Sequence, residues 1–294
     1  MTGVARSVIV DALDRAGLLV AEHGAMPSEL TGIADDSRAV TSGALFVAVR
    51  GSARDGHEFL GAAAANGAAA AIVEDASFDV LPAIVVTDAR RAAAVAAAAF
   101  YENPSAGMTL IAVTGTNGKT TTVGMLRHLL DADGARSASI GTLGVLIGSE
   151  ARPLDGGAGL TTPGPVELQR VLRELAAKGV RTVAMEVSSH ALAQRRVEGI
   201  EFDAAVFTNL TRDHLDYHGT MDVYLAAKES LLGHLAPRGV AVRNADDPAW
   251  GRADAGRADV GGAAPSVLSY GQSSPTADVR ATGVHFTSRD RFLK

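Results

Sequence analysis

Hydrophobic and polar positions divide the chain into alternating helices and strands, which fall into two series. In the first series, helical periodicity runs from Val8 to Val20 and an apolar strand follows at Leu45–Val49. An alanine-rich helix over Glu58–Ala69, the short strands AIV and AIVV, and a helix ending near Tyr101 complete it. Gly, Asp and Pro bound these segments, as is typical of turns. The pattern predicts a small α/β domain over residues 1–103.

Turn residues at Glu102–Gly107 separate this series from the second, over residues 104–294. The second series alternates strand and helix in the order LIAVT, a helix from Lys119, SASIGT, a helix over Pro165–Lys178, TVAMEV, AAVFTN, a helix over Met221–Leu235 and GVAVRN, with an alternating strand-like segment at Val279–Phe286. Such alternation predicts a mostly parallel sheet covered by helices, with ligands at the carboxyl ends of its strands. The expected fold class is therefore α/β: a small N-terminal domain followed by a P-loop-type domain.

Composition narrows the classes of function. A chain of 294 residues with net charge -6 and no long Lys/Arg run is not expected to have nucleic acid or an anionic membrane as its main partner. The absence of cysteine excludes disulfides, thiolate metal sites and a cysteine nucleophile. The longest apolar stretch, Ala92–Phe100, is shorter than the ~20 residues of a membrane helix. Asp11 interrupts the apolar run at Val8–Val10, so no signal peptide is expected, and a cytoplasmic protein is predicted.

A glycine-containing turn stands between the strand and the helix that open the second series. Residues 109–122 read TLIAVTGTNGKTTT. The common phosphate-loop pattern G-x-x-x-x-G-K-[ST] needs glycine at position 113, where this chain has Val113. Gly115 and Gly118 nevertheless let the backbone close around phosphate oxygens, and the N-terminus of the following helix attracts anions. The stretch predicts a variant nucleotide-binding loop in preference to an ordinary strand-to-helix turn.

Two side chains of this loop have distinct expected roles. Lys119 is placed to bridge the β- and γ-phosphates of ATP, and the Thr120 hydroxyl is placed to ligate Mg²⁺. The predicted ATP-binding residues are Gly115, Thr116, Asn117, Gly118, Lys119, Thr120 and Thr121.

Further along the chain, carboxylate and imidazole groups suggest metal chemistry. Glu186 ends an apolar strand, where a carboxylate is costly unless it meets a cation. Glu186, Thr120 and ATP oxygens therefore make a reasonable magnesium site, and a surface salt bridge is the alternative for Glu186. His214 and His218 stand at i and i+4, as in some transition-metal sites. Because no third nitrogen or thiolate ligand is evident, phosphate chemistry is the preferred interpretation, and His218 is expected to be exposed.

Two polar stretches are candidates for substrate contacts. Asp36, Ser37 and Arg38, with the loop over Gly51–His57, offer hydroxyl, guanidinium and backbone donors that suit a diphosphate group. Taken alone, D-S-R is more typical of a turn or helix cap. The stretch LTTPGP at residues 160–165 places hydroxyls ahead of a helix, which also fits a helix cap followed by proline at the first helical position.

Four stretches, in order along nearly the whole chain, carry a family resemblance. T-G-T-N-G-K-T-T resembles the ATP loop of the Mur ligases and of the folylpolyglutamate synthetases. Three others resemble the MurE type of Mur ligase, which adds the third amino acid of the peptidoglycan stem: DDSRAVTSGALFVAVRGSARDGHEF at Asp35–Phe59, MEVSSHALAQRRV at Met185–Val197 and FTNLTRDHLDYHGTMDVYLAAKESLL at Phe207–Leu232. The D-S-R block with its following D-G-H favours this type over the folylpolyglutamate synthetases.

The resemblance implies roles for particular residues. The N-terminal domain would hold the UDP end of the substrate through Asp35, Ser37, Ser52, Ala53 and Arg54. The muramoyl and peptide parts would contact Thr161, Thr162, Ser188, Gln194 and Arg196. Magnesium would be held near Thr120, Glu186, His214 and Lys228, and the catalytic residues would be Lys119, Lys228 and His214.

Lys228 would otherwise be interpreted as a solvated helix lysine. In the family the matching lysine is carbamylated by CO₂, so an N6-carboxylysine is expected here. The resulting anion can lie beside Mg²⁺, and its formation needs a neutral amine, which nearby cations favour.

The implied reaction is ATP-dependent amide-bond formation through an acyl phosphate. UDP-MurNAc-L-Ala-D-Glu and an amino acid, diaminopimelate or lysine, would be the substrates, ATP and Mg²⁺ the cofactors, and the protein a monomer.

Mur ligases have a third, C-terminal domain, and no stretch of this chain matches it. The chain is therefore expected to be the N-terminal part of a ligase, inactive alone but able to bind the UDP substrate. Two alternatives stay open. One is a MurF-type ligase or a folylpolyglutamate synthetase relative, and the other is a nucleotide-binding module without catalytic activity.

Overall fold

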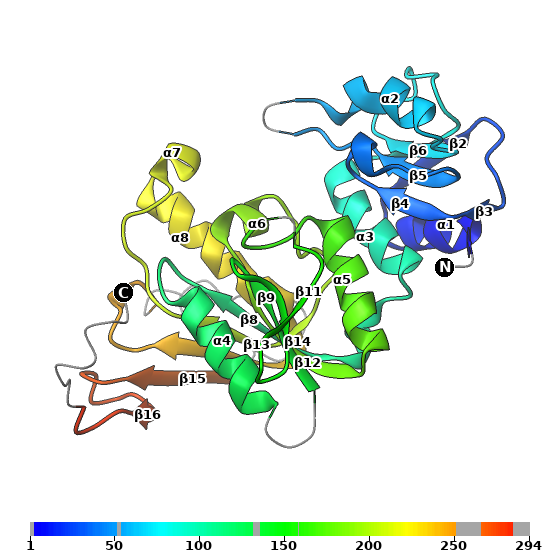
Figure 1. Ribbon diagram of the computed structural model, residues 1–294. Helices are drawn as coiled ribbons and strands as arrows, with labels where there is room; N and C mark the ends of the chain where they lie inside the picture. The colour runs from blue at the N-terminus through cyan, green and yellow to red at the C-terminus, as the bar shows by residue number, and fades with distance from the viewer. Residues whose placement is uncertain (1–2, 52–53, 132–135, 158, 251–265, 285–294) are drawn as a thin grey trace.

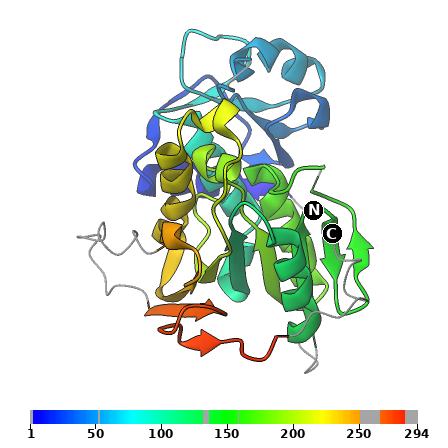
Figure 2. The same ribbon diagram turned by 90° about the vertical axis from the view of Figure 1, so that its left-hand side faces the viewer.

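The computed structural model describes residues 3–51, 54–131, 136–157, 159–250 and 266–284 (Figure 1). Two α/β units follow each other along the chain, each built on its own sheet. Figure 2 shows the first unit, coloured blue to cyan, at one end of the molecule and the last strands, coloured red, at the other.

The first unit contains a five-stranded sheet. Its strand order is β2 (Leu19–His23), β7 (Ala83–Val86), β6 (Ala70–Val73), β5 (Ala44–Val47) and β4 (Gly32–Ala34), parallel except for the β2–β7 pair. Alternate strand residues face opposite layers. Leu45 and Ile72 pack with α1 (Arg6–Arg15) and α3 (Ala89–Phe100), whereas Phe46 and Ala71 pack with α2 (Leu60–Ala65). The remaining elements are β1 (Val4–Ala5), β3 (Glu29–Leu30), η1 (Ser37–Ala39) and η2 (Gly56–Phe59).

The second unit contains a nine-stranded sheet. Its order is β11 (Arg152–Leu154), β10 (Gly144–Ile147), β9 (Arg136–Gly141), β12 (Val180–Glu186), β8 (Thr109–Thr114), β13 (Phe202–Phe207), β14 (Leu235–Asn244), β15 (Ser266–Gly271) and β16 (Val279–Arg280). In this order, all neighbouring pairs from β9 through β12, β8, β13, β14 and β15 to β16 are parallel. The strand β10 is antiparallel to both β9 and β11. The predicted α/β class with a mostly parallel second sheet is confirmed.

Helices cover both faces of the second sheet. Leu168 and Leu172 of α5 (Pro165–Ala177) pack with Leu110 in one core, whereas Val123 of α4 (Lys119–Leu130) packs with Val113 in another. The remaining elements are η3 (Pro104–Gly107), α6 (Ser189–Ala193), α7 (Leu215–His218), α8 (Met221–Glu229) and η4 (Ser230–His234).

Several predicted helices are shorter in the structure. The helix expected over Val8–Val20 ends at Arg15, because Gly17 adopts φ +66° and turns the chain into β2. The helix expected over Glu58–Ala69 is η2 followed by α2, and it ends before Gly67, which has φ +97°.

Two further predicted elements also differ near the C-terminal end of the chain. The helix expected over Met221–Leu235 tightens into η4 after Glu229. The strand expected over Val279–Phe286 is β16, only two residues long, and residues 285–286 lie outside the described part of the chain.

The two units meet along α3 and α5 (Figure 1). Val166 at the start of α5 is buried in the apolar core of the first unit. Arg91 on α3 pairs with Glu198 at 3.0 Å, and Arg173 on α5 pairs with Glu102 at 2.7 Å. Within the described residues, no helix is long and apolar enough to cross a membrane.

Candidate active site at the carboxyl ends of the strands

The turn between β8 and α4 has the backbone shape of an anion-binding loop. Gly115 adopts φ +140° and Gly118 adopts φ +83°, which side-chain-bearing residues rarely do. A Cβ on Gly115 would also collide with the Thr208 hydroxyl. Val113 is fully buried in β8, where it pairs with both β12 and β13. The position that the common pattern assigns to glycine is thus strand here, and the loop begins at Gly115.

Residues after β13 hold this loop. Thr116 N donates to Asn209 O at 2.7 Å, and Asn117 N donates to Asn209 Oδ1 at 3.0 Å. The Thr208 hydroxyl donates to Asn117 O at 2.7 Å. We did not predict roles for Thr208 and Asn209 from the sequence, although a polar Thr-Asn pair directly after an apolar parallel strand was a usable signal.

Two lysine ammonium groups converge on this loop. Lys119 Nζ donates to Gly115 O at 2.9 Å and to Thr116 O at 2.8 Å, and Lys228 Nζ donates to Gly115 O at 2.9 Å. Lys228 is only 1% exposed, so the interpretation as a solvated helix lysine is wrong. Burial, with the Lys119 charge second, lowers the pKa of Lys228 to about 7. Burial also lowers the pKa of Lys119, while Glu186 and Asp213 act against it.

Tyr224 is a further residue of the site that sequence reasoning missed. It is fully buried on α8, one helical turn before Lys228, whose Nζ lies 4.6 Å from the centroid of the Tyr224 ring. The Tyr224 hydroxyl lies 3.1 Å from Thr116 Oγ1. The spacing of four residues from a lysine was the available signal, because residues at i and i+4 share a helix face.

Glu186 lies at the end of β12 and is 1% exposed. Its carboxylate accepts bonds from Thr142 N at 2.9 Å and from the Thr142 hydroxyl at 3.3 Å. No ion pair of Glu186 occurs among the described residues, so the surface salt-bridge alternative is wrong. A buried carboxylate that forms no ion pair with the described residues fits a magnesium ion nearby. Thr120, at the second position of α4, is half-buried, and its hydroxyl makes no hydrogen bond within the described part of the chain.

The two threonines before α5 lie at the Glu186 end of β12 and do not cap the helix. The buried Thr162 hydroxyl donates to Glu186 O at 2.9 Å and accepts from Ser188 N at 3.1 Å. Thr161 Oγ1 lies 3.2 Å from Thr142 Oγ1. Pro165 occupies the first turn of α5 as expected, but no side chain caps that helix, so the capping role expected of the hydroxyls is wrong.

The predicted substrate residues after β12 lie around the same threonine. Ser188 caps α6 by accepting from Ala191 N at 3.1 Å. Arg196 donates to Thr162 O at 2.8 Å and to Gln194 Oε1 at 2.8 Å. The helix α6 ends at Ala193, because Arg195 adopts φ +53°. That turn brings Arg196 back beside Thr162, with Gln194 bonded to its guanidinium group.

The segment with the two histidines has one exposed and one buried ring. His214, with φ +52°, is exposed and precedes α7. His218 is 7% exposed, which corrects the expectation that it is exposed; it is buried because its ring lies against α6 and α8. The described residues contain no group of three His, Asp or Glu side chains positioned to hold a metal by themselves.

The residues predicted to hold UDP lie in the first unit. Asp36 caps η1 and pairs with Arg38 at 2.6 Å, so the helix-cap interpretation of D-S-R is confirmed. Arg54 pairs with Glu58 at 3.0 Å. Ser37 opens η1, and Asp35 Oδ2 lies next to Gly164 of the second unit. Ser52 and Ala53 lie outside the described residues.

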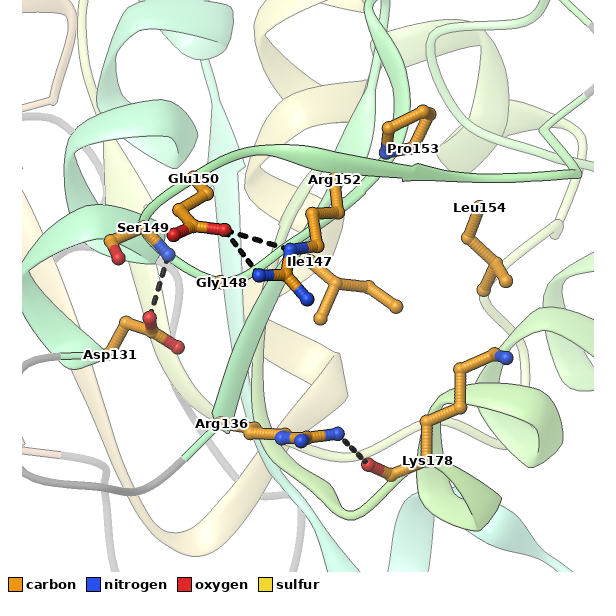
Figure 3. A pocket seen from close by; sticks show the side chains of 10 residues that line it. All are labelled: Asp131, Arg136, Ile147, Gly148, Ser149, Glu150, Arg152, Pro153, Leu154 and Lys178. Atoms are coloured by element: carbon orange, nitrogen blue, oxygen red, sulfur yellow. Dashed lines mark hydrogen bonds and ion pairs between the residues drawn. The ribbon is translucent and has the colours of Figure 1, made fainter.

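A pocket of about 530 Å³ opens elsewhere on the second unit (Figure 3). Its lining includes Arg136 at the start of β9, Lys178 after α5 and the β10–β11 hairpin. This is the amino edge of the parallel sheet, opposite the loop that follows β8. None of the predicted site residues lines it, so volume alone does not identify the site.

Comparison with known protein families shows to which family a chain with these features belongs. Residues 113–293 match the Mur ligase middle domain, and residues 29–107 match the Mur ligase family catalytic domain. The chain belongs to the Mur ligase family. The resemblance seen in the four sequence stretches is confirmed.

The relatives of this Mur ligase chain point to one type. It is 44% identical over 272 residues to the UDP-N-acetylmuramoyl-L-alanyl-D-glutamate--2,6-diaminopimelate ligase of Geobacter metallireducens, covering 90% of this chain and 51% of that protein. It is 50% identical to the ligase of the same name from Chlorobaculum tepidum, over 74% of this chain and 43% of that protein. A solved structure with this ligase name has a TM-score of 0.73 at 28% identity, covering 95% of this chain and 54% of that one. The chain thus spans about half the length of the relatives it matches.

Proposed function

We propose that this chain forms the ATP- and UDP-substrate-binding part of a MurE-type ligase, which adds the third amino acid to UDP-MurNAc-L-Ala-D-Glu. One observation carries the proposal. Lys119 and the buried Lys228 meet on the Gly115 carbonyl, at the mouth of an anion-binding loop. This arrangement occurs in a chain 44% identical to a ligase of that name.

The proposed reaction has two steps. The terminal carboxylate of the dipeptide attacks the γ-phosphorus of ATP, the bond to the bridging oxygen breaks, and ADP leaves. The amine of the incoming amino acid then attacks the acyl phosphate, loses a proton and expels inorganic phosphate. No side chain acts as a nucleophile, so the residues of the chain contribute position and charge.

Lys119 supplies positive charge to the transferred phosphoryl group. In the structure its ammonium group bonds to two loop carbonyls, which are weaker partners than phosphate oxygens. We therefore expect Lys119 to move from these carbonyls to the nucleotide. Backbone amides at the start of α4 provide the remaining donors.

Glu186, Thr120, His214 and the carbamate of Lys228 are the proposed magnesium ligands. A bound magnesium ion would neutralise phosphate charge at this place. Carbamylation of Lys228 needs its neutral amine, and burial next to Lys119 provides it near pH 7. The carbamate would turn a cation beside Lys119 into an anion and so remove the repulsion between the two side chains.

The muramoyl peptide is proposed to bind over Thr161, Thr162, Ser188, Gln194 and Arg196. Thr162 bonds directly to the strand end that carries Glu186, so this site adjoins the proposed metal site. Arg196 offers a guanidinium group suited to a carboxylate. The UDP end would lie on the first unit at Asp35, Ser37 and the Ser52–Arg54 loop.

Nucleotide affinity tests the proposal. Titration of the purified chain with a non-hydrolysable ATP analogue and Mg²⁺ is expected to show binding that Lys119→Ala weakens at least about tenfold, or about 1.4 kcal/mol. Lys178→Ala, at an exposed lysine, is the matched control and should bind as the wild type. Equal affinity of the Lys119→Ala and wild-type chains would refute the assignment of this loop.

A further inference from the structure

The segment Thr211–Thr220, which contains His214, is largely exposed to solvent. Eight of its ten residues are exposed and Leu215 is half-buried. Only His218, at 7% exposure, is buried. A helix as short as the four-residue α7 has no stability of its own. Its position must therefore come from contacts that the segment makes with its surroundings.

One end of the segment is tied to the ATP loop. Thr211 N donates to Thr116 Oγ1 at 3.0 Å, and the Thr116 hydroxyl lies 3.2 Å from Thr211 O. These bonds hold Thr211, the first residue of the segment, in place. The six residues between Thr211 and His218 have no buried side chain.

The other end is tied to α6 by His218. Its Nε2 lies 3.0 Å from the hydroxyl of Ser189, which is 1% exposed. The His218 ring also contacts the Tyr224 ring, at 5.2 Å between centroids. Ser189 directly follows Ser188 of the proposed muramoyl site, and Tyr224 bonds to the ATP loop. His218 therefore lies between the two proposed binding sites without belonging to either.

His214 depends on this anchor for its place. His218 N donates to His214 O at 2.9 Å, the single turn of α7. The His214 ring rests on His190 of α6 at 4.7 Å, an exposed contact without a hydrogen bond. If His218 left Ser189, α7 would lose its buried hydrogen bond. The contacts that remain would be made by the exposed side chains of His214 and Tyr217: ring contacts with His190 and Tyr224, and a 3.5 Å hydrogen bond from Gln194 to the Tyr217 hydroxyl.

We propose that His218 is a positioning residue that, through its hydrogen bond to Ser189, holds α7 and thereby sets the position of His214 beside the ATP loop. The importance of that position rests on the proposed function. The anchoring itself does not, because it follows from burial and contacts.

Amide hydrogen exchange, measured by mass spectrometry on the chain without ligands, tests the anchor. Ser189→Ala and His218→Leu are expected to raise exchange of peptides spanning residues 211–220 at least tenfold, with exchange in β8, β12 and β13 unchanged. His218→Gln should keep slow exchange, because the glutamine amide nitrogen can take the place of Nε2. His128→Gln, at an exposed histidine of α4, is the control.

A role in general stability would give a different pattern. Exchange would then rise throughout the second unit, and His218→Gln would behave like His218→Leu. That result, or unchanged exchange of residues 211–220 in both Ser189→Ala and His218→Leu, would overturn the proposal. If His218→Leu does not fold, Ser189→Ala, which removes one hydroxyl oxygen, decides alone.

A binding measurement separates this inference from the proposed function. Affinity for the Mg²⁺ complex of the ATP analogue is expected to fall at least fivefold in Ser189→Ala. The separate variant His218→Gln is expected to bind it with the wild-type affinity. If the wild-type chain binds no nucleotide but the exchange pattern is as expected, the anchor holds and the proposed function fails. If nucleotide binds and the exchange of residues 211–220 does not change, the positioning proposal fails alone.

Discussion

At the scale of single residues, Lys228 connects protonation to the proposed chemistry. Its side chain is buried against the ring of Tyr224 and bonds to Gly115 O. Burial first, and the Lys119 charge second, bring its pKa from 10.5 to about 7. A buried ammonium group with this pKa is easily neutralised, and only the neutral amine reacts with CO₂.

The lowered pKa predicts how stability depends on pH. Between about pH 7 and pH 10.5 the unfolded chain holds a proton on Lys228 that the folded chain has lost. The free energy of unfolding should therefore rise with pH in this window, by at most about 1.4 kcal/mol per pH unit, and this contribution should be constant below pH 7. Urea unfolding in CO₂-free buffer should show a steeper rise of the free energy of unfolding with pH in the wild type than in Lys228→Met, because Lys119, whose pKa burial also lowers, contributes to both. Equal slopes in the two proteins would contradict the burial argument.

The same lysine should carry the carbamate. A ¹³CO₂-saturated sample is expected to give a carbamate carbon signal above pH 7 that weakens below it, because protonation removes the reactive amine. The signal should be absent in Lys228→Met and kept in the matched variant Lys178→Met. A signal that survives in Lys228→Met belongs to another amine and returns Lys228 to a purely structural role.

The sequence was a limited guide at this scale. Lys119 follows from the loop pattern, because the chemistry of phosphate binding dictates residue type and spacing. Lys228 followed only from a family resemblance, since helical periodicity cannot tell a buried lysine from a solvated one. Tyr224 and His218 were missed or misassigned because their burial depends on helices that are brought together only in the folded chain.

At the scale of elements, the loop after β8 is defined by its backbone. Gly115→Ala is expected to weaken nucleotide binding at least about tenfold and to lower stability by on the order of 1–3 kcal/mol, because φ +140° is unfavourable for alanine and Cβ meets Thr208. Gly124→Ala, inside α4 with open space around it, should bind normally and be slightly more stable. Calorimetric titration and urea unfolding of both variants measure this. Unchanged binding in Gly115→Ala would show that the loop does not hold phosphate in this conformation.

Strands and the longer helices were predictable from periodicity, and their ends less so. The predicted end of α3, the predicted start of α4 and both predicted ends of α5 lie within a residue or two of those observed, because the apolar spacing is consistent over twelve or more residues. The helix expected from Val8 was too long because the apolar residues Leu19 and Val20 fit both the helical repeat that precedes them and a short strand. A single glycine with positive φ, Gly17, decides between them.

At the scale of the whole molecule, the α3–α5 contact fixes the first unit against the second. Val166 of α5 is buried in the core of the first unit, so the two units should unfold in one transition. Val166→Asp places a charge in that core and is expected to split thermal unfolding into two transitions. Val20→Asp, at a 59% exposed residue of β2, should leave one. Two transitions in the wild type would mean that the contact couples the units weakly.

Binding of UDP-MurNAc-L-Ala-D-Glu to the purified chain tests the central claim most directly, because the proposed UDP and muramoyl sites lie on the two units that this contact joins. Calorimetric titration is expected to show saturable binding that Arg196→Ala weakens at least about tenfold and that Arg195→Ala, at the exposed neighbouring arginine, leaves unchanged. Folate titrated in the same way should give no binding. Failure of the folded wild-type chain to bind the UDP-muramoyl dipeptide, or binding of folate in its place, would contradict the assignment as the substrate-binding part of a MurE-type ligase.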